Sequence, residues 1–95
     1  MANITVLSPV GEPRAATAAI PARPASLRRL TVGFLDNTKH NFDRLVEGIG
    51  EALKERLGVA RVVHARKANA ASPAAPDLIA ALAKECDLVF AGSAD

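Results

Sequence analysis

The 95-residue chain has little of what several classes of protein require. Its one cysteine, Cys86, excludes an internal disulfide bond and agrees with a reducing, cytoplasmic setting. That cysteine and two histidines, scattered along the chain, predict no metal site, and the residues present imply no cofactor. No apolar run approaches the roughly 18 residues that a membrane-spanning helix needs, so no association with a membrane is expected.

Aromatic side chains and net charge are also scarce. With three phenylalanines, no tryptophan and no tyrosine, the chain lacks the stacking platforms of single-strand nucleic-acid binders. The formal net charge of +2 is too small for a nucleic-acid-binding surface. Residues 1–29 carry a net charge of +3, and the rest of the chain, at −1, is nearly neutral. No nucleic-acid partner is therefore expected.

The composition divides the chain into an arm and a domain. Residues 1–29 are predicted to form an extended arm that opens with a short β-prone segment, NITVLS at 3–8. Prolines and a glycine end that segment, and the alanine- and proline-rich stretch 14–25 supports neither a lasting strand nor an uninterrupted helix.

Residues 30–95 alternate between strand and helix patterns. LTVGFL and LVFAG are continuous apolar runs of strand length, whereas ARVVHA is less apolar and belongs nearer a sheet edge. The first helix has apolar residues at helical spacing, and the second is expected to bury Leu78, Ile79 and Leu82. The predicted elements are a strand at 30–35, a helix at 42–57, a strand at 60–65, a helix at 76–84 and a strand at 88–92.

This β-α-β-α-β order predicts an α/β fold with a parallel sheet and right-handed crossovers. We expect a partial doubly wound, flavodoxin-like sheet of three strands in the order 2-1-3. Two helices cannot cover both faces and both edges of such a sheet. Residues 30–95 are therefore interpreted as an incomplete domain; a homo-oligomer, a partner subunit and a self-sufficient small domain are the alternatives.

The loop DNTKHN at 36–41 is the main candidate site, because ligands bind beyond the carboxyl ends of parallel strands. It offers carboxylate and amide oxygens, amide donors, a hydroxyl and a cation, which together suit the carboxylate or phosphate of a small molecule. The candidate substrate-binding residues are Asp36, Asn37, Thr38, Lys39 and Asn41. The alternative is structural: Asn41 caps the following helix and Asp36 makes an Asx turn.

Three other side chains with chemical potential have plainer interpretations. His40 is a candidate general base, but an exposed loop histidine is more often simply solvated. His64 lies in the middle of a strand, so it is interpreted as a packed or edge residue rather than a ligand. Cys86 precedes an apolar strand and is expected to behave as a small hydrophobic residue.

Four segments resemble the UGSC family of small bacterial proteins: NITVLSPVG at 3–11, ARPASL at 22–27, VGFLDNTKHN at 32–41 and CDLVFAGSAD at 86–95. The family is named for a selenocysteine-Gly-Ser-Cys motif, in which cysteine replaces selenocysteine in many members. The resemblance places that motif directly after Asp95, so we expect Gly92, Ser93 and Asp95 to lie just before it in the sequence. His40 departs from the family pattern, which often has proline there.

The resemblance implies a selenocysteine- or cysteine-dependent thiol or selenol oxidoreductase acting on a small molecule or a thiol partner. This chain would be the N-terminal portion of that enzyme. A UGA codon for selenocysteine, if read as a stop codon, would end the chain at Asp95. The chain would then contain no catalytic residue. Two other classes remain open: a non-catalytic α/β subunit that docks on a partner, and an anion-binding module that uses the loop 36–41 alone.

Overall fold

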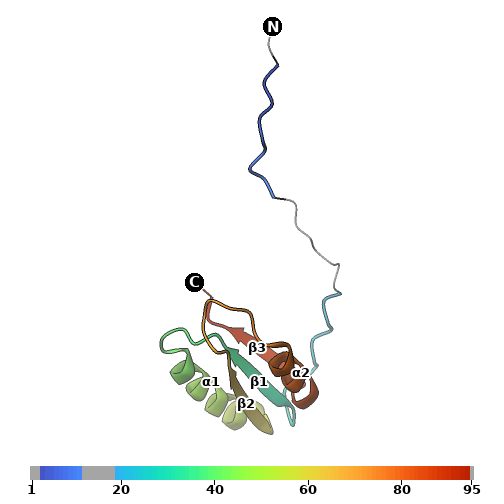
Figure 1. Ribbon diagram of the computed structural model, residues 1–95. Helices are drawn as coiled ribbons and strands as arrows, with labels where there is room; N and C mark the ends of the chain where they lie inside the picture. Colours follow the sequence, from blue (N-terminus) through green and yellow to red (C-terminus); the bar gives the residue numbers. More distant parts are fainter. Residues whose placement is uncertain (1–2, 12–18, 95) are drawn as a thin grey trace.

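The computed structural model describes residues 3–11 and 19–94 and confirms the α/β alternation (Figure 1). The elements are β1 (Thr31–Asp36), α1 (Phe42–Leu57), β2 (Arg61–Arg66), α2 (Pro76–Glu85) and β3 (Leu88–Gly92). The boundaries of α1 and β3 match the prediction. Strands β1 and β2 begin and end one residue later than expected, and α2 is one residue longer.

The three strands form a parallel sheet in the predicted order β2-β1-β3. In register, Thr31 of β1 lies opposite Arg61 of β2, and Val32 lies opposite Leu88 of β3. The last residue of β1, Asp36, is paired with both Arg66 and Gly92. The carboxyl ends of all three strands therefore meet at one edge of the sheet, beside the loop that leads into α1.

The main core lies between the sheet and α1. It consists of the buried residues Val32, Phe34, Val46 and Val59. Phe34 extends this core toward β3, where its ring lies 5.6 Å from that of Phe90, centroid to centroid. Because side chains alternate along a strand, Val32, Phe34 and Asp36 point to the α1 face of the sheet.

The opposite face of β1 carries Gly33, which lies against Cys86 at the end of α2. A Cβ added to Gly33 would lie 2.6 Å from the Cys86 sulfur, so the strand and the helix end fit closely only with glycine here. Burial raises the pKa of the Cys86 thiol, and the nearby Glu85 carboxylate adds to this effect. A thiol of this kind stays protonated, in agreement with its predicted role as a small hydrophobic residue.

One expectation about burial is corrected. Ile79 is 52% exposed rather than buried, because α2 packs on the sheet through Leu82, which is 4% exposed. Strand β3 lies at an edge, as the predicted strand order requires, and its Val89 and Phe90 remain 38% and 45% exposed. The sheet is thus open on the β3 side among the residues that the structure describes.

The arm also differs from the expectation. Residues 3–11 are extended and exposed, and they pair with no described strand, so the predicted short β segment at 3–8 is not formed. Such a segment has no stability without a neighbouring strand. The arm joins the domain where Leu27 packs on the core and the Arg29 amide donates to the Gly58 carbonyl at 2.8 Å. Over residues 3–11 and 19–94, the structure contains no helix with the length and hydropathy needed to cross a membrane.

Candidate functional site

The candidate site lies at the carboxyl edge of the sheet, where a tight loop joins β1 to α1. Thr38 and Asn41 both adopt the left-handed backbone conformation, with φ of 68° and 67°. A β-branched residue rarely adopts this conformation, which costs on the order of 1–3 kcal/mol. Hydrogen bonds from the loop amides to the side-chain oxygens of Asp36 and Asn37 hold the loop in this shape.

Asp36 belongs to β1 rather than to the loop, and its side chain is fully buried. One carboxylate oxygen accepts the Thr38 amide at 2.7 Å, which forms the predicted Asx turn. The other oxygen lies 2.8 Å from Nε2 of His64 and 3.5 Å from Nε of Arg66. Burial raises the pKa of Asp36, but the hydrogen bonds from His64 and Thr38 and the electrostatic attraction of His64 and Arg66 outweigh this effect, so the pKa lies below its ordinary value. Asp36 is therefore an ionised carboxylate surrounded by protein donors.

Asn37 ties the loop to the segment that follows β3. Its side-chain amide donates to the Ser93 carbonyl at 2.8 Å, and its side-chain oxygen accepts the Ser93 amide at 3.0 Å. The Asn37 backbone amide also donates to the Gly92 carbonyl at 2.9 Å. One side chain thus fixes both polar backbone groups of Ser93, a residue 56 positions away.

The remaining loop residues complete the turn into α1. The Lys39 amide donates to the Asn37 side-chain oxygen at 3.2 Å, and the Lys39 carbonyl accepts the Phe42 amide at 3.3 Å. Asn41 occupies the N-cap position of α1, but its side chain makes no capping hydrogen bond there. The capping role proposed for Asn41 is therefore wrong, because an effective cap needs an extended backbone rather than the left-handed one seen here.

A pocket of about 460 Å³ opens between the start of α1 and Ser93. His40 and Arg44 bring basic groups to it, and its other lining residues are Asn41, Phe42, Leu45 and Ser93. The Phe42 ring covers Gly92, where an added Cβ would lie 2.8 Å from the ring. Of the three residues expected to adjoin the family motif, Ser93 lines this pocket, Gly92 lies beneath the Phe42 ring, and Asp95 lies outside the described residues.

Sequence reasoning missed the partnership of His64 and Arg66 with Asp36. His64 is on an edge strand, as predicted, but its ring is engaged by a buried carboxylate. The alternation of side chains along β2 could have indicated this partnership. Val62, His64 and Arg66 lie on one face of β2, and the parallel register brings that face alongside Asp36. Within residues 3–11 and 19–94, no group of three or more histidine, cysteine or acidic residues is arranged to hold a metal ion.

Replacing Asn37 with alanine is expected to release Ser93. The change removes two hydrogen bonds to the Ser93 backbone, so the free energy of unfolding should fall by about 1–2 kcal/mol. Hydrogen exchange of the Ser93 amide should become faster. Asn41→Gly is the matched control, since that side chain makes no capping hydrogen bond and glycine readily adopts the left-handed backbone at this position. Equal exchange of Ser93 in both variants would contradict this account of Asn37.

Comparison with known proteins identifies one family. The sequence model of the UGSC family matches residues 5–95. No curated protein and no solved structure matches the chain.

Proposed function

The chain belongs to the UGSC family, and from that membership we propose that it is the N-terminal part of a selenocysteine- or cysteine-dependent thiol or selenol oxidoreductase. Its reactive residue would directly follow Asp95, in the motif for which the family is named. There, a selenolate or thiolate attacks one sulfur of a disulfide and the other sulfur leaves as a thiolate. The cysteine three positions later then displaces the bound sulfur. These two residues, and not the 95 residues of this chain, would carry the redox chemistry.

The observation that carries this proposal is the double hydrogen bond between Asn37 and Ser93. It holds the segment after β3 at the carboxyl edge of the sheet, where α/β proteins place their reactive groups. A residue three positions after Ser93 would start from a fixed point beside the loop and the start of α1. A reactive residue held in a fixed position can be oriented correctly toward its substrate, which lowers the barrier to reaction.

The loop and the adjacent pocket would receive the substrate. Thr38 and Lys39 lie in the loop, and Asn41 lines the pocket that also receives His40 and Arg44. These groups suit a small substrate with a carboxylate or phosphate, or an acidic thiol partner. Asp36 and Asn37 would act on that substrate indirectly, because protein groups already occupy their side chains. The single cysteine is consistent with function in the reducing cytoplasm.

The coding sequence tests the proposal directly. We expect a UGA codon after that of Asp95, followed in frame by codons for glycine, serine and cysteine. Expression with selenocysteine insertion, or with cysteine at that codon, would then yield the longer protein, detected by its mass. A UAA or UAG codon, or a downstream frame without Gly-Ser-Cys, would refute the proposal.

One observation favours a second candidate, a non-catalytic α/β subunit. Strand β3 carries no charged residue, and its Val89 and Phe90 are 38% and 45% exposed. An exposed apolar edge strand of this kind readily pairs with another strand. In the proposed oxidoreductase, later strands of the same protein would cover it; in the second candidate, a partner subunit or a second copy would. A UAA or UAG codon after Asp95 would favour the second candidate.

A further inference from the structure

A small pocket of about 280 Å³ lies at the carboxyl edge of the sheet, on the α2 face. Side chains alternate along β1, so Leu35 points away from the α1 face to which Phe34 and Asp36 point. Ala91 is in register with Leu35 and shares its face. The lining residues come from the ends of β1 and β3 and from the connection between β2 and α2: Leu35, Asn37, Lys67, Ala74, Ala91 and Gly92.

This position is where an open parallel sheet places its ligands. In the order β2-β1-β3, the first crossover leads from β1 to β2, and the second leads from β2 back past β1 to β3. The strand order therefore reverses between β1 and β3, and α/β proteins bind ligands beyond the carboxyl ends of the strands at such a point. Leu35 of β1 and Ala91 of β3 are paired there, and both line the pocket.

Lys67 is the charged residue of the pocket, and the protein holds it at both ends. Its backbone amide donates to the Asp36 carbonyl at 2.9 Å, and its Nζ donates to the Ser72 carbonyl at 2.6 Å. The side-chain oxygen of Asn69 in turn accepts the Ser72 amide at 2.9 Å and the Ser72 hydroxyl at 3.0 Å. An ammonium group has three donors, of which the Ser72 contact uses one. In the described part of the chain, no carboxylate forms an ion pair with Lys67, so this positioned cation can receive an anion.

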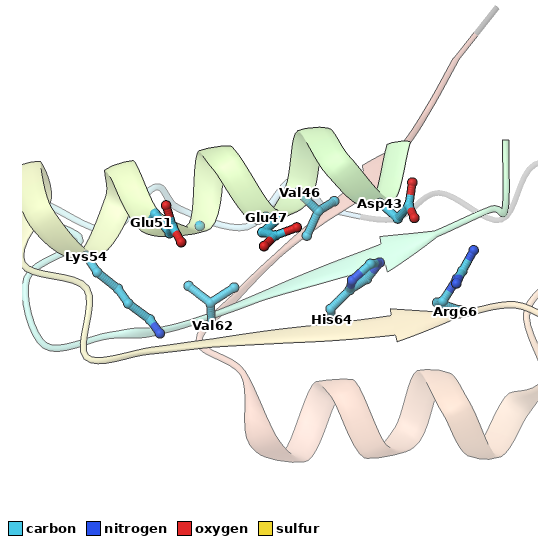
Figure 2. Close-up of a pocket in the computed structure, with 9 residues that line it drawn as sticks. Asp43, Val46, Glu47, Glu51, Lys54, Val62, His64 and Arg66 are labelled. Atoms are coloured by element: carbon cyan, nitrogen blue, oxygen red, sulfur yellow. The ribbon is translucent and has the colours of Figure 1, made fainter. Parts of the chain in front are cut away.

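The opposite face of the sheet does not offer an anion the same opportunity. Figure 2 shows His64 and Arg66 pointing from β2 toward α1, along a groove of about 530 Å³ with carboxylates of the helix above it. Both side chains already lie close to the buried Asp36 carboxylate, at 2.8 and 3.5 Å. Their charges are therefore compensated, and the helix carboxylates repel an anion from this groove. Lys67 follows Arg66 and lies on the other face of the sheet, away from these carboxylates.

We propose that the pocket on the α2 face binds a short aliphatic carboxylate. Lys67 receives the carboxylate group, and the carbon chain lies against Leu35, Ala74 and Ala91. One cation balances one negative charge, whereas a phosphate dianion would bring a second charge that no other cation of the lining meets. The volume is just below the usual range of roughly 300–1,000 Å³ for small-molecule sites, so the ligand has few carbon atoms. This site is separate from the pocket at the start of α1, and it does not depend on the proposed redox function.

Titration of the 95-residue chain with butyrate, followed by nuclear magnetic resonance at constant ionic strength, tests the site. We expect a dissociation constant on the order of 1–10 mM for so small a ligand, with the largest amide shifts at Ala74, Ala91 and Gly92. Butyramide keeps the shape of butyrate without its charge and should bind about tenfold more weakly or less, as should inorganic phosphate. Equal binding of butyramide or phosphate would overturn the assigned ligand class. Shifts centred on His40 and Leu45 would place butyrate in the other pocket and overturn the site.

Two substitutions test the cation and the cavity separately. Lys67→Met should weaken butyrate binding by about tenfold or more, and Lys67→Arg should keep it within about threefold of wild type. Ala91→Leu fills the cavity while the Ser72 contact of Lys67 remains, and it should also weaken binding by about tenfold or more. Lys54→Met, at an exposed lysine of α1, is the matched control and should leave binding unchanged. Wild-type affinity in Lys67→Met or in Ala91→Leu would overturn the proposal. These results do not depend on the codon after Asp95, so the site and the proposed function can fail separately.

Discussion

Replacing Asp36 with alanine is expected to lower the free energy of unfolding by about 3 kcal/mol. The change removes the acceptor for the Thr38 amide, for Nε2 of His64 and for the Arg66 guanidinium. The estimate is below the largest values for buried ion pairs because His64 and Arg66 remain partly in contact with water, at 30% and 55% exposure. Since small domains are stable by about 5–15 kcal/mol, much of the stability would be lost. Urea unfolding followed by circular dichroism measures it.

The same carboxylate makes stability depend on pH in a defined direction. The pKa of Asp36 in the folded chain lies below the ordinary value of 3.8, so its contribution is present at higher pH. That contribution is lost as the pH falls below about 4 and through the folded-state pKa. In Asp36→Asn this part of the acid dependence should disappear. If wild type and Asp36→Asn lose stability in parallel between pH 5 and pH 2, the carboxylate does not have the role described here.

Replacing Gly33 with alanine is expected to destabilise the domain by about 2–3 kcal/mol. The new methyl group would lie 2.6 Å from the Cys86 sulfur and 3.3 Å from a Val89 methyl carbon. Both neighbours belong to packed elements, so the end of α2 or strand β3 must shift. Thermal unfolding would report the loss as a lower melting temperature.

A double-mutant cycle shows whether the Cys86 sulfur is responsible. Cys86→Ala removes that atom, so Gly33→Ala should cost clearly less in the Cys86→Ala background. Gly48→Ala is the matched control, because an added Cβ there meets nothing within 4 Å. In the middle of a helix, that change should stabilise the chain by about 1 kcal/mol. If the effects of Gly33→Ala and Cys86→Ala are simply additive, the close contact between β1 and the end of α2 does not limit this position.

The strands could be predicted because their signals are local. Continuous apolar runs at β1 and β3 and the more polar β2 indicate three strands with β2 nearer an edge. The order 2-1-3 followed from the flavodoxin-like fold class that the β-α-β-α-β alternation predicts. The exposure of Ile79 could not be predicted in this way. Helical periodicity indicates which residues share a face of α2. Which residues of that face touch the sheet depends on how the helix packs, and here Leu82 is buried while Ile79 is not.

The location of the loop that follows β1 could be predicted, but the interactions of its side chains could not. The loop after β1 lies at the carboxyl edge, and the Asx turn at Asp36 depends on residues two positions apart. The partners of Asn37 and Asp36 are remote: Ser93 is 56 residues from Asn37, and His64 is 28 residues from Asp36. These contacts depend on strand register, which alternation alone does not determine.

The central position of β1 has a consequence for the order of events during synthesis. β1 is made before both strands that pair with it, and the pairs Thr31–Arg61 and Val32–Leu88 join distant parts of the chain. The 56 residues between Val32 and Leu88 take about 3–11 s to translate at usual rates. During that time the apolar β1 strand leaves the ribosome with at most one partner. Of the three strands, β1 would therefore be the first that a chaperone for extended apolar segments could bind, and the contact between Asn37 and Ser93 would be among the last to form.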